Sequence, residues 1–301
     1  MTSVTCVGLA VLDVVFGVGS SPSRGQKTFA DSMTLTGGGP AANAAATIAR
    51  LNGDARFIGC LGDDSVASLI LEDFAAWGVD ASRVRKISSA SSPISTIAVE
   101  PDGERTIVNY SDPRLFAAEG RITADDVFGA DAVLGDLLWP GGALSAMNVA
   151  RDLGIPGILD FDHACPVAID QALTAPTHII FSAPALAATS GEDDPVSGLL
   201  YVRRRTASWI AVTVGAAGVV WLDGNDEIGR APAFDVEVAD TLGAGDVFHG
   251  AFALALAERR PIEEVIQRAS AAAALKCTRF GGRLGIPSAE EVSDFLEPSA
   301  E

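Results

Sequence analysis

Positive charge is scarce in this chain of 301 residues. It carries 21 lysines and arginines against 39 aspartates and glutamates, which gives a formal net charge of −18. Nucleic acids and anionic membrane surfaces are bound through basic patches, so neither is an expected partner. A polyanionic substrate would need local positive groups, because the field of the whole molecule repels it.

Cysteines are also few, and they are scattered. There are four, with no Cys-x-x-Cys pair and no histidine at the spacing of a zinc site: Cys6, Cys60, Cys165 and Cys277. We expect free thiols of a cytoplasmic protein and neither disulfides nor a zinc centre. Long apolar runs are missing, since charges or turn residues interrupt each one, and the N-terminus lacks a basic segment. A membrane span and a signal peptide are therefore not expected.

Hydrophobic residues (48%) and glycines (31) are abundant, which suits a loop-rich α/β protein with a large core. From residue 132 onward, strand-like runs alternate with helical ones. The expected strands are 132–135, 157–160, 178–181 and 209–214. This alternation predicts a mostly parallel central sheet flanked by helices on both faces. The sequence contains neither a repeat nor a linker, so we expect one domain over residues 1–301.

The first third of the chain interrupts this pattern. A first strand is expected at residues 4–12, followed by Asp13 at the edge where ligands bind in open α/β sheets. An exposed strand is expected at residues 27–35. A hairpin at 95–100 and 105–110 turns at Pro-Asp-Gly-Glu. We expect segments of about 15–36 and 93–113 to form a small β-sheet lid that expels water from a site.

Residues 240–246, Asp-Thr-Leu-Gly-Ala-Gly-Asp, gather groups that can do chemistry. They lie between a strand-like run at 234–239 and a helix expected to begin near Val247. Bare N–H groups at a helix N-terminus favour an anion, and Asp246 beside them could accept a proton from a hydroxyl. This combination suits phosphoryl transfer. The plainer interpretation is a helix-capping aspartate on a glycine turn.

Two further glycine-rich segments come earlier in the chain. Residues 37–43 read Gly-Gly-Gly-Pro-Ala-Ala-Asn before an expected helix at 41–51, and residues 59–64 read Gly-Cys-Leu-Gly-Asp-Asp. They resemble the first signature of the ribokinase (pfkB-type) carbohydrate kinases, and residues 240–250 resemble the second. The resemblance covers nearly the whole chain. It implies a ribokinase-like α/β fold and transfer of phosphate from ATP, with magnesium, to a primary hydroxyl of a sugar.

The resemblance also implies roles for individual residues. Asp246 would be the general base. The anion hole would be formed by the backbone of Leu242, Gly243, Ala244 and Gly245. The sugar hydroxyls would be bound by Asp13, Gly38, Gly39 and Asn43. The nucleotide would lie along Thr213, Gly215 and Gly218, and against Leu242, Gly243 and Gly245.

Within the family, the chain looks most like the sulfofructose kinases, in which a lysine, an asparagine and an arginine grip the sulfonate. Lys27 and Asn109 match the first two, but Leu138 stands where the arginine is expected. A sulfonate would lose its bidentate partner there, unless Arg114 replaces it. An uncharged ketose such as fructose, or a ribose-like sugar, is at least as well supported.

The metal site departs from the family pattern as well. The family's Asn-x-x-Glu, which orders metal-bound water, is replaced here by Ser-Ala-Pro-Ala at residues 182–185. Asp160 and Asp162 follow a neighbouring strand. They could help hold a hydrated magnesium ion, or they could be solvated turn residues.

Other functions remain open at this point. A nucleoside kinase would need an aromatic side chain, such as Trp139 or Phe116, to stack on the base. A sugar- or nucleotide-binding protein without turnover would keep the fold. His163, His249, Lys276, Arg279 and Arg283 are interpreted mainly as structural residues. We expect a homodimer formed by lids that pair edge to edge, because exposed sheet edges need covering.

Overall fold

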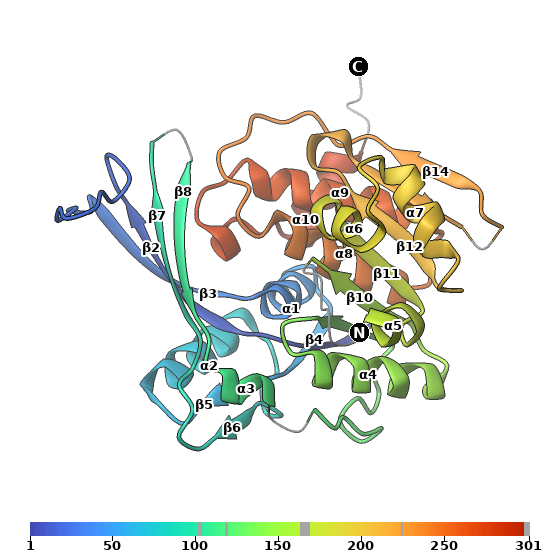
Figure 1. Cartoon of the computed structure of the whole chain (residues 1–301), viewed down its shortest axis with the longest axis horizontal. Helices are drawn as coiled ribbons and strands as arrows, with labels where there is room; N and C mark the ends of the chain where they lie inside the picture. Colours follow the sequence, from blue (N-terminus) through green and yellow to red (C-terminus); the bar gives the residue numbers. More distant parts are fainter. Residues whose placement is uncertain (102–103, 118–119, 163–168, 224, 298–301) are drawn as a thin grey trace.

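An eight-stranded sheet forms the centre of the computed structural model, which describes residues 1–101, 104–117, 120–162, 169–223 and 225–297 (Figure 1). The strand order is β14-β13-β12-β11-β10-β9-β1-β4. The strands are β1 (Ser3–Val7), β4 (Asp54–Ile58), β9 (Ala132–Asp136), β10 (Gly157–Phe161), β11 (His178–Ser182), β12 (Trp209–Thr213), β13 (Val219–Leu222) and β14 (Ile228–Ala231). All neighbours from β4 to β12 pair in parallel, and β13 and β14 complete the sheet as antiparallel strands.

Helices cover both faces of this sheet. One face packs against α1 (Pro40–Arg50), α2 (Ser65–Trp77), α8 (Ala244–Ala257), α9 (Ile262–Cys277) and α10 (Ala289–Leu296). The other face packs against α4 (Pro140–Leu153), α5 (Ile169–Thr174), α6 (Ala183–Ser190) and α7 (Pro195–Arg203). The central strands are buried on both sides, as in other parallel sheets. The predicted α/β fold is confirmed.

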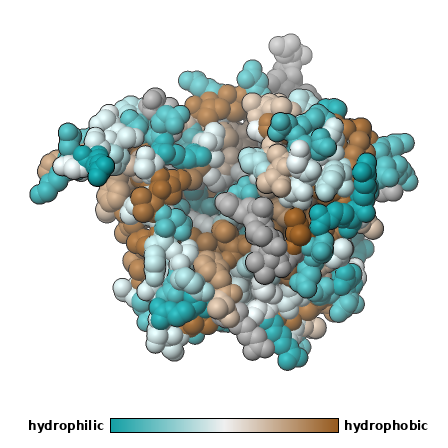
Figure 2. All heavy atoms as spheres, in the orientation of Figure 1, coloured by the Kyte–Doolittle hydropathy of each residue, from teal (hydrophilic) through white to brown (hydrophobic). Residues whose placement is uncertain are grey.

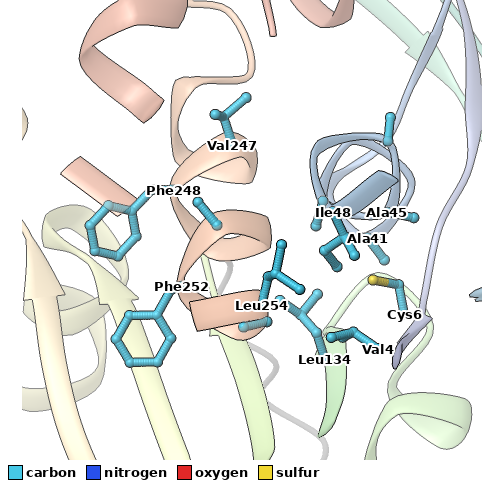
Figure 3. Close-up of a cluster of buried hydrophobic side chains, with 14 of the residues drawn as sticks. Val4, Cys6, Ala41, Ala45, Ile48, Leu134, Val247, Phe248, Phe252 and Leu254 are labelled. Carbon is cyan, nitrogen blue, oxygen red and sulfur yellow. The ribbon is translucent and has the colours of Figure 1, made fainter. Parts of the chain in front are cut away.

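The core between α1 and α8 brings these two helices together at the site described below. Small side chains of α1, such as Ala41 and Ala45, let it approach α8 closely, while Phe248 and Phe252 of α8 fill the space over the sheet (Figure 3). Burial of such side chains supplies most of the stability of helices of this length. The first turns of α1 and α8 are therefore held side by side by packing.

A separate four-stranded sheet, in the order β3-β2-β7-β8, lies beside the large one (Figure 1). Its strands are β2 (Val11–Gly17), β3 (Ser32–Gly38), β7 (Ile94–Val99) and β8 (Arg105–Tyr110). The small sheet predicted from the sequence is thus present. Residues 102 and 103 of the predicted hairpin turn lie outside the described residues.

The N-terminal strand prediction was wrong in one respect. Residues 4–12 form two strands, because the chain leaves the large sheet after Val7. The N–H of Gly8 then donates to the carbonyl of Ile58, and the N–H of Leu9 donates to Asp136 Oδ2 at 2.9 Å. Asp13 is consequently the third residue of β2 in the small sheet and does not end a strand of the large sheet.

Several other boundaries differ from the prediction. Residues 234–239 form no strand, since the N–H groups of Ala239 and Asp240 donate to the carbonyl of Cys277 at the end of α9. The strand predicted at 27–35 begins at Ser32, and α8 begins at Ala244, three residues earlier than expected. Several elements were missed, among them α6 and β14. The remaining short elements are β5 (Cys60–Gly62), β6 (Arg85–Ile87), α3 (Pro113–Ala117), η1 (Gly215–Ala217) and η2 (Gly282–Gly285).

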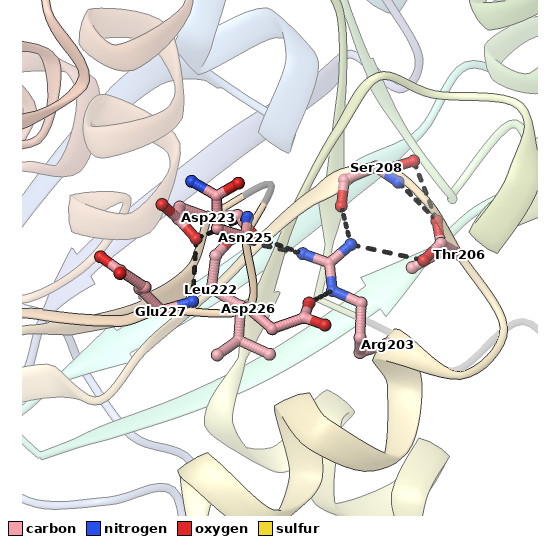
Figure 4. A network of polar contacts seen from close by, with 8 residues as sticks. All are labelled: Arg203, Thr206, Ser208, Leu222, Asp223, Asn225, Asp226 and Glu227. Carbon is pink, nitrogen blue, oxygen red and sulfur yellow. Dashed lines mark hydrogen bonds and ion pairs between the residues drawn. The ribbon is translucent and has the colours of Figure 1, made fainter.

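Arg203 fastens the antiparallel edge of the large sheet (Figure 4). From the end of α7, Nη1 donates to the carbonyl of Ser208 at 2.8 Å and Nη2 to that of Asp223 at 3.1 Å. Nε lies 2.8 Å from Asp226 Oδ1. One guanidinium therefore joins α7, the start of β12 and the β13–β14 hairpin.

Candidate active site

The carboxyl ends of the parallel strands meet at one edge of the large sheet, where α1 and α8 begin. Asp136 ends β9, and its Oδ2 accepts the N–H of Ala41 in the first turn of α1 at 3.0 Å. Asn43, also in that turn, reaches Asp246 in the first turn of α8. Ligands of open α/β sheets bind at this kind of edge.

Asp246 is held at this edge by the side-chain amide of Asn43. The Nδ2 atom of Asn43 donates to Asp246 Oδ2 at 2.6 Å. The pKa of Asp246 is raised to about 7, mainly by burial, with the charges of Asp162 and Asp136 adding to the effect. The hydrogen bond from Asn43 and the charge of Arg283 oppose it. A carboxylate with a pKa near neutrality is suited to general base catalysis at physiological pH.

The turn before Asp246 offers fewer free N–H groups than the sequence suggested. The N–H of Leu242 donates to Asp240 Oδ1 at 2.8 Å, and that of Ala244 to the carbonyl of Thr241 at 3.2 Å. The N–H groups of Gly243 and Gly245 have no acceptor among the residues that the structure describes. Gly243 adopts a φ of 76° at the N-cap of α8 and faces Asn43 and Asp246. The space in front of Gly245 is open, so an anion could approach these two N–H groups.

Asp240 anchors this turn to its surroundings. The ammonium of Lys276, whose side chain is 0% exposed, lies 2.8 Å from the carbonyl and 3.0 Å from Oδ2 of Asp240. Oδ2 also accepts the N–H groups of Gly281 and Gly282, each at 3.1 Å. The turn that precedes Asp246 is therefore fixed to α9 and to η2. These contacts confirm the structural interpretation of Lys276.

The small sheet contributes Asp13 and Asn109 from one face. In the strand register, Asp13 lies opposite Ser95, and Ser95 lies opposite Asn109. Asn109 Nδ2 donates to Ser95 Oγ at 2.9 Å. A Cβ atom on Gly38 would overlap the carboxylate of Asp13, so the glycine is required for this close approach. Burial raises the pKa of Asp13 to about 6, against a hydrogen bond from Ser95 and the charge of Arg283.

Asp136 is a central residue that sequence reasoning missed. It is 2% exposed, and besides Leu9 and Ala41 it accepts the N–H of Leu138 on Oδ1 at 2.9 Å. These bonds join the exit of β1, the start of α1 and the turn after β9. The signal that could have identified Asp136 is its position directly after the apolar residues Ala-Val-Leu-Gly of the same strand.

The residues predicted to hold a sulfonate are not assembled into a cationic site. Leu138 is half-buried beside Asp136, and Lys27 is exposed in the loop before β3. Arg114 is bound to Asp112 through Nε at 2.9 Å and Nη2 at 2.5 Å. The surroundings of Asp246 are thus rich in carboxylates, which favours an uncharged ligand over an anionic one.

On the nucleotide side, Thr213 ends β12 and Gly215 begins η1 with open space in front of it. Gly218 also has a structural role, because a Cβ atom there would overlap the carbonyl of Ala231 in β14. Trp139 is 2% exposed and packs in the core, with the guanidinium of Arg85 5.5 Å from its ring centroid. It is therefore not placed to stack on a nucleobase.

Asp160 lies inside β10 and is 3% exposed, so the interpretation as a solvated turn residue was wrong for it. Burial, together with the charges of Asp246 and Asp136, raises its pKa well above the usual value. His249 Nδ1 lies 3.3 Å from Asp160 Oδ2, and burial lowers the pKa of His249 to about 4, so this contact involves a neutral imidazole. Asp160 Oδ1 has no hydrogen-bond partner among the described residues. His163 lies outside them.

Magnesium has a restricted set of protein ligands here. The described residues include no group of three His, Cys, Asp or Glu side chains that could hold a metal ion. Asp160, with its buried unpaired oxygen, and Asp162 just beyond the same strand, could provide one or two carboxylates. That donor set fits an ion held mainly by phosphates and water, which is a common arrangement for magnesium.

Known proteins match the chain over nearly its whole length. Residues 1–289 match the pfkB family carbohydrate kinases. The chain is 27% identical over 304 residues to the ribokinase of Haemophilus influenzae, with 98% of each protein covered. A crystal structure of a provisionally assigned ribokinase from Agrobacterium tumefaciens has a TM-score of 0.94 and 39% identity, covering 97% of this chain and 96% of that one. Arabidopsis thaliana ribokinase, solved with ribose and ATP, has a TM-score of 0.88 and 24% identity and covers 99% of both chains.

Among the described residues, no helix is both long enough and apolar enough to span a bilayer.

Proposed function

Because the chain belongs to the pfkB family of carbohydrate kinases, we propose that it transfers the γ-phosphate of ATP to the primary hydroxyl of an uncharged sugar, ribose or a related pentose or ketose. One observation carries this proposal. A buried carboxylate with a pKa of about 7, Asp246, lies in the same helical turn as the N–H groups of Gly243 and Gly245, for which the described part of the chain provides no acceptor. A base and an anion site in one turn are the two parts that phosphoryl transfer needs.

The proposed chemistry starts with the sugar between the two sheets. Asp13, Asn43 and the backbone of Gly38 and Gly39 would hold its hydroxyls. Asp246 would accept the proton of the primary hydroxyl as the oxygen attacks the γ-phosphorus. The N–H groups of Gly243 and Gly245 would stabilise the negative charge on the transferred group, and ADP would leave with the bridging oxygen.

The preference for an uncharged sugar rests on charge. Asp13, Asp136 and Asp246 converge on the sugar side, and the guanidinium of Arg283 nearby is already paired with Asp73. A sulfonate or phosphate on the sugar would meet carboxylates without a free cation at position 138. Such a substituent would lose a charge-assisted bond worth roughly 1.5–3 kcal/mol.

ATP would lie over Thr213, Gly215 and Gly218, with its terminal phosphate towards Gly243. The similarity to a ribokinase solved with ribose and ATP supports ATP as the bound nucleotide. Asp160 and Asp162 would hold the magnesium ion through its water shell. The bound ion would reduce the repulsion between the phosphates and the site's carboxylates.

The small sheet would act as a lid and as a dimer interface. Its inner face carries Asp13 and Asn109, so side chains of opposite parity face outward. That outer face exposes Met33, Leu35, Val108 and Tyr110. Figure 2 shows apolar surface over this part of the molecule. Pairing with the lid of a second copy would cover these side chains and the edge strands β3 and β8.

The test of the proposal is ATP consumption against a panel of acceptors, with and without magnesium. The panel contains ribose, fructose, tagatose, sulfofructose, fructose 6-phosphate, adenosine and inosine. We expect saturable turnover with an uncharged sugar and at least tenfold lower kcat/KM for sulfofructose than for fructose, as roughly 1.4 kcal/mol per tenfold implies. Faster turnover of sulfofructose or of a nucleoside would contradict the assignment. No turnover, with thermal stabilisation by ATP or a sugar, would indicate a binding protein.

A further inference from the structure

Arg283, on the short helix η2, is a buried cation that the proposed reaction does not use. The residue is 3% exposed, although a guanidinium is almost never buried without partners. Nε donates to Asn43 Oδ1 at 2.9 Å, Nη2 lies 3.4 Å from the carbonyl of Gly38, and Nη1 pairs with Asp73 of α2. The side chain therefore connects α2, the end of β3 and the first turn of α1.

The contact with Asn43 determines which way the Asn43 amide faces. A guanidinium has only donors, so the atom of Asn43 that meets Arg283 must be the carbonyl oxygen. The amide nitrogen then points to Asp246 and donates to its carboxylate at 2.6 Å. With the amide reversed, an oxygen would face the carboxylate at this distance, which is repulsive.

Arg283 is itself held in one position. Asp73 fixes the end of the guanidinium, and the ring centroid of Phe74 lies 5.6 Å from its central carbon. Gly37 leaves the necessary room, because a Cβ atom there would overlap Arg283 and Asp73. A continuous chain of contacts thus runs from Asp73 through Arg283 and Asn43 to Asp246.

We infer that Arg283 is a positioning residue, which orients the Asn43 amide and thereby holds Asp246 in place to accept the proton of the substrate hydroxyl. This inference rests on the proposed function of Asp246. The charge of Arg283 also lowers the pKa values of Asp246 and Asp13. Geometry and charge can be separated, since lysine keeps the charge but cannot make the three-way planar contact.

The experiment compares Arg283→Lys and Arg283→Met with the wild type in kcat, KM and the pH dependence of kcat/KM. We expect kcat to fall about 100-fold in both variants, because the base is no longer fixed in its reactive position. The acid limb of kcat/KM should move to higher pH in both variants, because the hydrogen bond from Asn43 that lowers the pKa of Asp246 is weakened, and it should move further in Arg283→Met, which also loses the positive charge. Arg279→Met, in the connection just before η2, is the matched control. It breaks the pair with Glu291 and should leave kcat within about twofold and the acid limb at the wild-type pH.

A second variant and an NMR measurement test the inference independently of the kinetics of the Arg283 variants. If the Arg283 variants do not fold, Asp73→Asn leaves Arg283 in place without its anchor and should lower kcat roughly tenfold. The pKa of Asp246, followed by carbon NMR of the carboxyl groups, does not require turnover. A wild type that transfers no phosphate would therefore refute the proposed function, whereas an unchanged Asp246 pKa in Arg283→Met would refute the inference. Wild-type kcat in a folded Arg283→Met or Asp73→Asn protein would also overturn it.

Discussion

At the scale of single residues, the site concentrates carboxylates that burial makes costly to ionise. Asp136 and Asp160 are 2% and 3% exposed, and burial raises the pKa values of both. Asp246 and Asp13 have pKa values raised to about 7 and about 6. Perturbed groups gathered in this way are typical of a functional site. Because burial raises these pKa values, ionisation of the carboxyl groups lowers the free energy of unfolding of the protein.

The first prediction concerns the pH dependence of the reaction. Asp246 must be ionised to accept a proton, so kcat/KM should rise with pH and level off above its pKa of about 7. Asp13→Asn should lower kcat/KM at every pH while leaving the limb near pH 7, because Asp13 titrates near 6. Initial rates from pH 5 to 9 check this. A wild-type profile that is flat between pH 5.5 and 8 would contradict the assignment of Asp246.

The second prediction concerns stability. The pKa of Asp246 is raised on folding, so its contribution to stability is fully present below the unfolded value of 3.8 and is lost as pH rises to about 7. Asp246→Asn has no carboxyl group to ionise at this position, so this loss of stability does not occur in the variant. The variant should gain a few kcal/mol over the wild type between pH 4 and 7 and keep the gain above pH 7, at 1.36 kcal/mol per pKa unit. Thermal unfolding of both proteins at pH 4 and pH 8 measures it, and an equal difference in Tm at both values would argue against the buried charge.

At the scale of elements, the sequence predicted those whose pattern is complete in itself. Helix α2 has its start and stop signals next to it in the sequence, since Asp64 caps its start and Gly78 ends it. Residues 234–239 alternate like a strand, yet they bond to the end of α9, and no local pattern reveals that partner. Strand β14 is short, half exposed and contains glycine, so it gave no strand signal. The turn before α8 is anchored by the contact between Asp240 and Lys276, which lie 36 residues apart in the sequence.

The third prediction tests that joint between elements. Lys276→Met should leave the partly buried carboxylate of Asp240 with one partner fewer, a change that costs roughly 1–3 kcal/mol. The turn before α8 should loosen, so kcat should fall together with Tm. Lys86→Met, which removes an exposed pair with Asp63, is the control and should change neither. Chemical denaturation and initial rates provide both readouts, and a Lys276→Met protein with wild-type stability would show that the joint is unimportant.

At the scale of the whole molecule, the site lies between two sheets that each contribute side chains. The large sheet provides Asp136 and the starts of α1 and α8, and the small sheet provides Asp13 and Asn109. Arg105 of β8 crosses to the turn before the base, with Nη1 donating to Thr241 Oγ1 at 3.2 Å. The alternation of strands and helices predicted the large sheet, the hairpin predicted the small sheet, and the glycine-rich motifs predicted that Asp246 is the base. The Asp136 and Arg283 networks could not be read from the sequence, since they join segments as much as 245 residues apart.

The fourth prediction tests the association of two copies through the small sheet. Val108 is 65% exposed on its outer face, so Val108→Asp should put a charge into the interface of a dimer and give a monomer. Leu200→Asp, at an exposed position on α7, should leave the dimer intact. Analytical ultracentrifugation at micromolar concentration measures the masses. A monomeric wild type with full activity would refute the lid-mediated dimer.

The most direct test of the account is the transfer of labelled phosphate from [γ-32P]ATP to ribose by the wild type and by Asp246→Asn at pH 8. Calorimetric binding of ribose and an ATP analogue is measured on both proteins. We predict labelled ribose phosphate from the wild type, a rate at least roughly 10³-fold lower in the variant, and nearly equal binding by the two proteins. A variant that transfers phosphate within about tenfold of the wild-type rate would contradict the assignment of Asp246 as the base.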